Sequence, residues 1–257
     1  MMFSQTEKDV LLISVLVVLY VLECLFPYFE TYQNKTRHTL RNLGLIGFNA
    51  VVVNLLLTPL VVFSTNTTGG VFNWMGLSGW GAFFATILML DFVTYVLHVF
   101  YHKIPLMWRF HRVHHSDVAM GVTTGARFHL GEHLISTVVK CAFYTGFGIK
   151  MEYLVVYEAV FISNVFFHHA NISIGHQLDR YYRIFLTSPN MHKVHHSDVK
   201  SETDSNYTSL FSVWDRMFKT FRIVEDPKRI VYGIKGMADE QTVVRMLTMP
   251  FRDIETN

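Results

Sequence analysis

The stretch WGAFFATILMLDFVTYVLHVFYHKIPLMWRFHRVHHSDV, residues 80–118, joins a long apolar run to a cluster of histidines. A helix needs roughly 20 mostly apolar residues to cross a bilayer. Trp80–Phe100 supplies a run of this length, in which Asp91 is the one Asp, Glu, Lys or Arg. The stretch therefore predicts a membrane helix that ends in a group of histidines.

Further apolar runs lie on both sides of this stretch, and the last two are short. They are Val10–Phe29, Leu43–Ser64, Leu134–Ile149 and Tyr153–Phe167. The short pair forms either two spans or a re-entrant hairpin. A soluble helical protein is the alternative, but a domain of this size can hardly bury so many apolar runs. We therefore expect an all-α integral membrane protein with about four to five membrane helices and a cytoplasmic helical cap that carries the histidines.

The charges between the runs predict an orientation, because cytoplasmic loops carry an excess of Lys and Arg. Residues 30–42 contain three basic side chains and residues 65–79 contain none, whereas basic residues recur after the third run. This pattern puts the N-terminus outside and the chain after His98 inside, except that the fourth and fifth runs would go out and return. Glu7, Lys8 and Asp9 do not form a positive leader region, so we expect the first run to remain as an anchor.

Composition excludes several other classes of protein. Only 16% of the 257 residues are charged, against about 25% in soluble domains. The net charge of +2 does not indicate a nucleic-acid-binding protein. Cys24 and Cys141 lie in apolar stretches and do not form a disulfide framework. We expect three parts: membrane anchor helices at 1–90, a histidine-rich core at 91–220 and a polar tail at 221–257.

The 14 histidines of the chain are concentrated in a few windows. HRVHHSDV at 111–118 and HKVHHSDV at 192–199 differ only at the second position. Spacings of three and four residues put side chains on one face of a helix. Each word therefore predicts a helical turn that presents three imidazoles. The candidate metal ligands are His98, His102, His111, His114, His115, His168, His169, His192, His195 and His196.

Imidazole is the commonest metal ligand among side chains, and it suits iron, zinc, copper and nickel. Ten histidines are too many for one ion, so the sequence predicts two. Ligating histidines usually donate their second N–H to a carboxylate or a carbonyl. Asp91, two helical turns before His98, is expected to act in this way. Asp117 and Asp198, which close the two words, are either such partners or ordinary turn residues.

Two other functions remain open from these residues. His129–His133 reads HLGEH, which matches the H-x-x-E-H word of some zinc peptidases. A zinc-dependent membrane hydrolase would use Glu132 to activate water, although this assignment leaves the ten clustered histidines unexplained. A metal transporter or sensor would need ionisable residues along several spans. The Glu-x-x-His pairs of soluble di-iron proteins are absent.

Between Asp91 and Thr220 the chain resembles the fatty acid hydroxylase superfamily, and within it the sterol desaturase family. The elements that carry the resemblance occur in a fixed order. They are DFVTYVLHVFYH, WRFHRVHHSD, TTGARFHLGEH, HHANISI, SPNMHKVHHSD, SETDSNY and WDRMFKT.

The resemblance implies two iron ions and dioxygen as co-substrate, although zinc can fill such sites in purified protein. It implies hydroxylation, desaturation or ether cleavage of a lipid of the sterol, fatty acyl, sphingoid or alkylglycerol type. Electrons would come from an external donor, which is a reductase, a ferredoxin or a cytochrome. The histidine site would face the cytoplasm, at a bacterial inner membrane or the endoplasmic reticulum.

The resemblance also assigns roles to individual residues. Nine of the ten candidate histidines match ligand positions, whereas His168 stands where relatives often have another polar residue. Val165 stands where some relatives have the first histidine of a pair that ends at His169. Arg127, His129, Glu132 and Asn171 match polar positions that recur in the family. Together with Asp91, which its spacing to His98 suggests, Glu132 and Asn171 are the non-histidine side chains expected to assist catalysis.

Overall fold

A computed structural model describes residues 4–29, 34–237 and 241–253 of the chain. Within these residues the protein is helical and contains no strand, only two isolated bridges. This confirms the predicted all-α class. The long helices are α1 (Gln5–Leu25), α2 (Lys35–Leu56), α5 (Gly79–Lys103), α7 (Leu130–Phe147) and α8 (Met151–His169).

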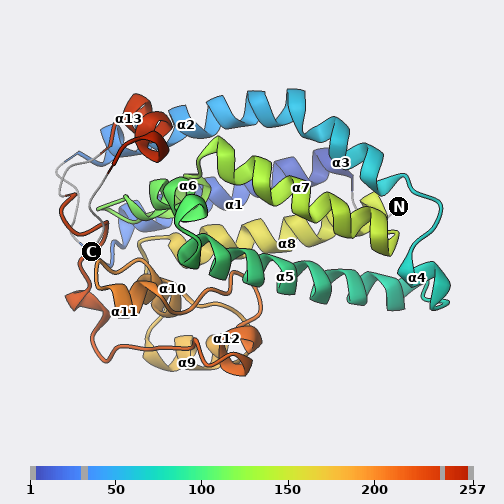
Figure 1. The fold of residues 1–257 in the computed structure, drawn as a ribbon. Coiled ribbons are helices and arrows are strands. Elements are labelled where there is room, and N and C mark those ends of the chain that lie inside the picture. The colour runs from blue at the N-terminus through green and yellow to red at the C-terminus, as the bar shows by residue number, and fades with distance from the viewer. Residues whose placement is uncertain (1–3, 30–33, 238–240, 254–257) are drawn as a thin grey trace.

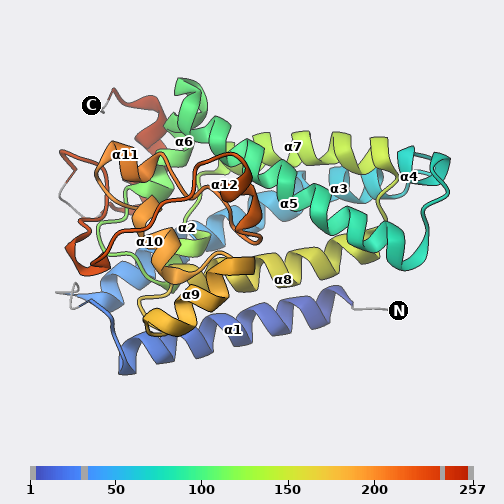
Figure 2. The same ribbon diagram turned by 90° about the horizontal axis from the view of Figure 1, so that it is seen from below.

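The long helices lie side by side along a common direction (Figures 1 and 2). The N-terminal end of α1 and the short helix α4 (Val71–Trp74) lie at one end of this bundle. The shorter elements that follow α5 lie toward the other end. They are α6 (Pro105–His115), η1 (Val122–Ala126), α9 (His176–Phe185), α10 (Pro189–His195), α11 (Lys200–Thr203), α12 (Val213–Met217), η2 (Pro227–Arg229), α13 (Val243–Thr248) and η3 (Met249–Phe251).

The second apolar run, predicted as one segment over Leu43–Ser64, is divided into two helices. The helix α2 ends at Leu56, and a second helix, α3 (Thr58–Thr65), forms the rest of the run. Pro59 lies in the first turn of α3. Because proline has no N–H and its ring clashes with the preceding turn, it interrupts a helix at this point.

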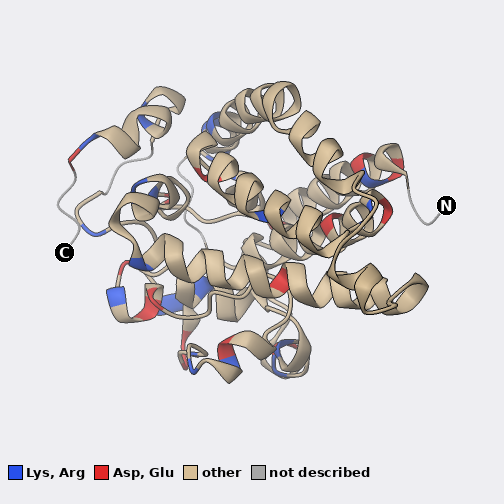
Figure 3. Ribbon diagram, turned by 45° about the vertical axis from the view of Figure 1, so that its right-hand side comes forward, with Lys and Arg blue, Asp and Glu red and all other residues tan. Residues whose placement is uncertain are grey.

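Two described helices, α2 and α5, are long and apolar enough to cross a membrane. Many large apolar side chains on the outside of the bundle have no protein neighbour to cover them. Phe26 on the C-terminal side of α1 is 68% exposed, and Phe63 on α3 is 74% exposed. Charged residues gather mainly toward the helix ends (Figure 3). So many exposed large apolar side chains are unusual on a soluble monomer and indicate contact with a membrane or a partner.

The helices α7 and α8 are antiparallel and are joined by a short turn at the same end of the bundle as α4 (Figure 1). The turn passes through Gly148, whose φ of +71° favours glycine. A Cβ at this position would lie 2.5 Å from the carbonyl oxygen of Gly69. The turn therefore packs directly on the loop before α4.

Two prolines set the positions of the short histidine-bearing helices. Ile104 is extended, since the residue before a proline is excluded from the helical region, and α6 begins at Pro105. The chain thus bends sharply after α5. The helix α10 begins at Pro189, and the Ser188 hydroxyl accepts a hydrogen bond from the Met191 N–H at 3.3 Å. Both helices start where a proline has no backbone N–H to leave unpaired.

The described part of the C-terminal segment packs against the rest of the protein. Met246 and Met249 form a buried cluster with Leu45 of α2 and Val113 of α6. The guanidinium of Arg112 donates to the Met249 carbonyl at 2.6 Å. This segment therefore covers the outer side of α6, which carries one of the two histidine words.

Candidate metal centre

The described histidines form two groups at the end of the bundle where α6 and α10 lie. In each group the ligand nitrogens all lie within 4.8 Å of one another. Group one consists of His98, His102, His111, His115 and His195. Group two consists of His114, His169, His192 and His196. The structure thus brings together nine of the ten predicted ligands.

The two repeated words are interleaved between the groups. The word on α6 gives His111 and His115 to group one and His114 to group two. The word on α10 gives His195 to group one and His192 and His196 to group two. Neither word forms a site alone, so each group depends on α6 and α10 directing their imidazoles toward each other.

The hydrogen bonds in group one fix which imidazole nitrogens carry protons. His98 Nδ1 lies 2.6 Å from the Tyr207 carbonyl oxygen, and His195 Nδ1 lies 2.7 Å from the Ser205 carbonyl oxygen. A carbonyl only accepts, so both Nδ1 atoms donate and both Nε2 atoms present lone pairs. These Nε2 atoms are 3.0 Å apart. Two lone pairs at this distance repel each other unless a cation binds both.

A third lone pair points to the same place. His111 Nδ1 donates to Glu132 Oε1 at 2.9 Å, and its Nε2 lies 3.0 Å from His98 Nε2. The distance from His111 Nε2 to His115 Nε2 is 3.2 Å. Two nitrogens bound about 2.1 Å from one ion, at right angles, are about 3.0 Å apart. The donor set of group one therefore fits a metal ion.

Group two has the same spacing but fewer orienting partners. His169 Nδ1 donates to the Val165 carbonyl at 2.7 Å, and its Nε2 lies 3.1 Å from His114 Nε2 and 2.9 Å from His192 Nε2. Among the described residues, the buried Nδ1 atoms of His114, His192 and His196 have no hydrogen-bond partner. Group two therefore also fits an ion, but its imidazoles are less firmly oriented.

The imidazoles of the two words are held in the form that binds metal. Burial, followed by the neighbouring imidazoles, lowers the pKa of His114, His115, His192 and His196 well below the ordinary value. These side chains are therefore neutral at neutral pH. Neutral imidazole is the ligand form, so little proton release is needed before an ion binds.

The metal-free protein is expected to lose stability on acidification. The pKa of these four imidazoles is lower in the folded protein than the value of about 6.5 in the unfolded chain. Below about pH 6.5 the unfolded chain therefore binds more protons, and the free energy of unfolding falls by up to about 1.4 kcal/mol per pH unit for each group. Thermal unfolding of chelator-treated protein at successive pH values measures this. A midpoint independent of pH between about 7 and 5 would contradict the expectation.

His168 lies outside both groups, contrary to its predicted role as a ligand. Its ring packs 4.0 Å from the ring of His192, and its Nδ1 lies 3.5 Å from the amide nitrogen of Asn164. Successive residues of a helix point about 100° apart. His168 and His169 at the end of α8 therefore cannot both face group two, and His169 is the one that does.

Glu132 supports group one as a hydrogen-bond partner of His111. The Tyr101 hydroxyl donates to the backbone carbonyl of Glu132 at 3.0 Å and so fixes the start of α7. Glu132→Ala is expected to lower the affinity of group one for metal about 10- to 100-fold, because loss of an orienting partner has this effect. Competition with a chelator measures the affinity. Unchanged affinity in the variant would mean that the carboxylate does not orient His111.

The sequence predicted that Asp91 orients His98, but in the structure it does not. Its carboxylate accepts from the Trp214 indole at 2.7 Å and from the Phe211 N–H at 3.1 Å, and so ties α5 to α12. Although Asp91 lies two helical turns before His98, it does not contact the imidazole, because His98 Nδ1 donates to the Tyr207 carbonyl.

Asn171 does not contact an imidazole of either group. Its side-chain amide donates to the Phe29 carbonyl at 2.9 Å and accepts from the Phe29 N–H at 3.0 Å. Its backbone N–H donates to Glu23 at 3.0 Å. Asn171 therefore fastens the residues after α1 to the end of α8, and its described contacts are structural.

The two aspartates that close the words have different surroundings. Asp117 is buried and accepts from His38 at 2.8 Å and from Thr124 at 2.7 Å, with Arg127 3.4 Å away. Asp198 is half-buried, and its carboxylate makes no hydrogen bond with the described residues. The pairing of Asp117 with His38 could not be predicted from local spacing, since 79 residues separate them.

The HLGEH word does not form a peptidase site. His129 Nδ1 accepts from the Gly131 N–H at 2.9 Å, and its Nε2 donates to the Leu247 carbonyl at 3.1 Å. Both ring nitrogens of His129 are therefore occupied. His133 lies in neither histidine group.

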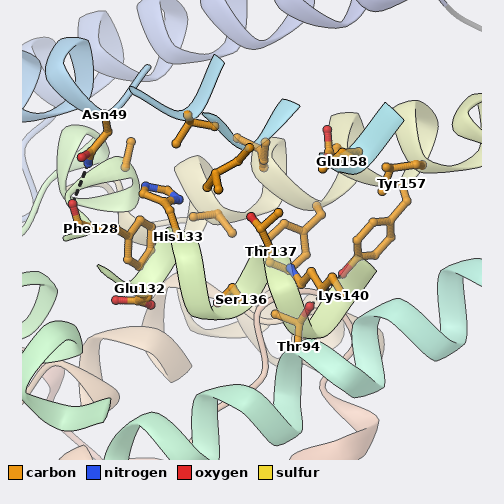
Figure 4. A pocket seen from close by; sticks show the side chains of 18 of the residues that line it. Asn49, Thr94, Phe128, Glu132, His133, Ser136, Thr137, Lys140, Tyr157 and Glu158 are labelled. Carbon is orange, nitrogen blue, oxygen red and sulfur yellow. Dashed lines mark hydrogen bonds between the residues drawn. The ribbon is translucent and has the colours of Figure 1, made fainter. Parts of the chain in front are cut away.

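A cavity of about 990 Å³ lies within the bundle and reaches the histidine groups. His98, His111 and His114 line one end of it. Figure 4 shows Glu132 and His133 toward that end, with Lys140 and Glu158 farther along. Most of the wall is apolar, and much of it comes from α2, α5, α7 and α8. The volume and the apolar wall suit an apolar molecule that reaches the histidines.

Comparison with known proteins gives one consistent family. Residues 83–220 match the fatty acid hydroxylase family. The ornithine lipid hydroxylase OlsE of Rhizobium tropici is 25% identical over 95% of this chain and 75% of its own length. Alkylglycerol monooxygenase of Xenopus tropicalis is 28% identical over 58% of this chain, and that of Homo sapiens is 25% identical over 64%.

The chain covers only 32% and 35% of the length of those two monooxygenases. No solved structure matches the chain significantly. The family match nevertheless extends over more than half of the chain and includes every histidine of the two groups. The chain therefore belongs to the fatty acid hydroxylase family and is an oxidoreductase.

Proposed function

We propose that the protein is a membrane di-iron oxygenase that hydroxylates a lipid with dioxygen and external electrons. The observation that carries this proposal is the pair of adjacent imidazole groups at the end of an apolar cavity. Iron bound there would supply the activation of dioxygen needed to oxidise an unactivated C–H bond. Hydroxylation is favoured over desaturation because the relatives carry the names hydroxylase and monooxygenase.

The described residues would contribute ligands, orientation and exclusion of water. Group one would hold one ion and group two the other. The carbonyls of Tyr207 and Ser205 and the carboxylate of Glu132 would keep three imidazoles directed at the first ion. The apolar wall of the cavity would hold a lipid chain beside His98 and His111 and keep bulk water away from the reacting carbon.

We propose five membrane passes, with the histidine groups at the cytoplasmic side. Support comes from the common direction of the long helices and from the turn after α7, which lies at the same end as α4 (Figure 1). The 18 residues of α7 extend about 27 Å, close to the thickness of the hydrocarbon core. The basic residues after the third apolar run support the cytoplasmic side. The membrane would be a bacterial inner membrane or the endoplasmic reticulum.

The hydrolase alternative is less well supported. It requires Glu132 to activate a metal-bound water, but the Oε1 atom of Glu132 accepts the Nδ1–H of His111. The relatives described above are a lipid hydroxylase and monooxygenases, not hydrolases. Among the described residues, the histidines of the HLGEH word belong to neither histidine group.

Metal analysis and isotope labelling together test the proposed function. Detergent-purified protein is expected to contain about two irons per chain, one for each imidazole group. Cells that express the protein under isotope-labelled dioxygen should accumulate a lipid with one labelled oxygen, and cells that express the double variant His114→Ala, His195→Ala should not. A single ion per chain, or a product without the label, would refute the proposal.

A further inference from the structure

A lysine lies inside the helix bundle, in the wall of the cavity. Lys140 of α7 points into the cavity toward α8 (Figure 4). Its ammonium nitrogen lies 5.7 Å from the centre of the Phe161 ring on α8. An ionisable side chain within a membrane segment is costly and is normally retained where it has a partner.

Lys140 forms no ion pair or hydrogen bond with the described residues. Glu158 across the cavity is already bound by Lys8, with the charged atoms 2.5 Å apart. Glu132 accepts from His111 at 2.9 Å. The other acidic residues of the wall, Asp9 and Glu152, belong to the end of the bundle where α1 and α8 begin. The cavity therefore contains an ammonium group without a bound carboxylate.

The surroundings of Lys140 suit the acid group of a lipid. The hydroxyls of Ser136, Thr137 and Thr94 also line the cavity, and Thr94 lies 3.3 Å from the Tyr157 hydroxyl. The Thr94 hydroxyl already donates to a backbone carbonyl at 2.8 Å, and that of Ser136 pairs with another hydroxyl at 2.9 Å. The Thr137 hydroxyl, which has no hydrogen bond with the described residues, can donate to an oxygen of an anion that Lys140 binds. The wall of the cavity as a whole is mainly apolar, as a hydrocarbon chain requires.

We propose that Lys140 binds the acid group of a single-chain anionic lipid whose chain extends to the histidine groups. This inference rests on the proposed function and specifies the substrate class for that site. Lys140 follows Glu132, the partner of His111, by eight residues on α7. At a rise of 1.5 Å per residue, the two side chains begin about 12 Å apart along the helix. The oxidised carbon would therefore lie well along the chain and not next to the acid group.

Equilibrium binding to the detergent-purified, metal-containing protein tests the proposal without turnover. The probes are palmitic acid, hexadecanol of the same chain length, and a single-chain lysophosphatidic acid. We expect the native protein to prefer an acid over hexadecanol about tenfold or more, and Lys140→Met to lose that preference without weaker binding of hexadecanol. Lys140→Arg should restore it. The acid whose binding the Lys140→Met substitution weakens shows whether Lys140 binds a carboxylate or a phosphate.

The matched control is Lys150→Met, because Lys150 is an exposed lysine at the start of α8 and does not line the cavity. It should bind all three probes like the native protein. If Lys140→Met binds each of the two acids as tightly as the native protein does, the inference is overturned. Metal content and unfolding midpoint are measured on the same samples. If the protein contains two irons but the Lys140 substitution does not change the preference for an acid, this inference alone is rejected. If the preference depends on Lys140 but the protein contains no iron, only the proposed oxygenase is rejected.

Discussion

Replacing His195 with alanine is expected to remove one metal ion per chain and to lower lipid hydroxylation at least about a hundredfold. Loss of a ligand should exceed the 10- to 100-fold effect of losing an orienting partner. His195 is oriented by the Ser205 carbonyl, and its Nε2 lies 3.0 Å from that of His98. His114→Ala should instead remove the ion of group two. Metal content per chain and the rate of product formation measure both effects.

The control for these variants is His176→Ala. His176 is the exposed first residue of α9 and belongs to neither histidine group. It should retain both ions and full activity. Retention of two tightly bound ions by His195→Ala would show that the assignment of ligands to group one is wrong. Loss of both ions from either single variant would show that the groups bind metal as one unit.

Asp117→Asn is expected to lower the free energy of unfolding by about 3–5 kcal/mol, the usual cost of removing one partner from a buried ion pair. Although burial alone would raise the pKa of the Asp117 carboxyl, His38 and Arg127 hold it well below its ordinary value. The variant leaves the buried Arg127 without this opposite charge. Denaturation of the detergent-solubilised protein, followed by helical circular dichroism, measures the change.

The repeated word supplies a matched control for this variant. Asp198→Asn makes the same substitution at the corresponding position of the second word. Because Asp198 is half-buried and its carboxylate has no hydrogen bond with the described residues, the change should be within about 0.5 kcal/mol. Similar losses in both variants would indicate that the negative charge acts through a long-range effect and not through the pairing of Asp117 with His38 and Arg127.

The sequence predicted the helical class and nine of the grouped histidines because both depend on local spacing. Residues three or four positions apart share a helix face whatever the rest of the chain does. The division of each word between two groups could not be predicted, since it depends on how α6 and α10 turn after Pro105 and Pro189. His168 was included because adjacency in sequence does not reveal which of two neighbours faces inward.

The partners of the imidazoles were largely missed for a different reason. Tyr207 and Ser205 act through backbone carbonyls, which every residue has, so side-chain identity carries no signal for them. Asp91 was chosen by its spacing on α5, but the indole of Trp214 binds it instead. Lys140 did leave a signal, as the one charged residue within the run Leu134–Ile149. An ionisable residue in such a run deserves a functional hypothesis from sequence alone.

The interleaving of the two histidine words has a consequence for biosynthesis. Each group needs imidazoles from α6 and from α10, and α10 begins only at Pro189. While the ribosome is still making the segment between them, the nascent chain contains neither complete group. Metal binding at either group must therefore follow translation of both words and docking of α10. A truncated chain that ends before Pro189 should emerge without the ability to retain either ion.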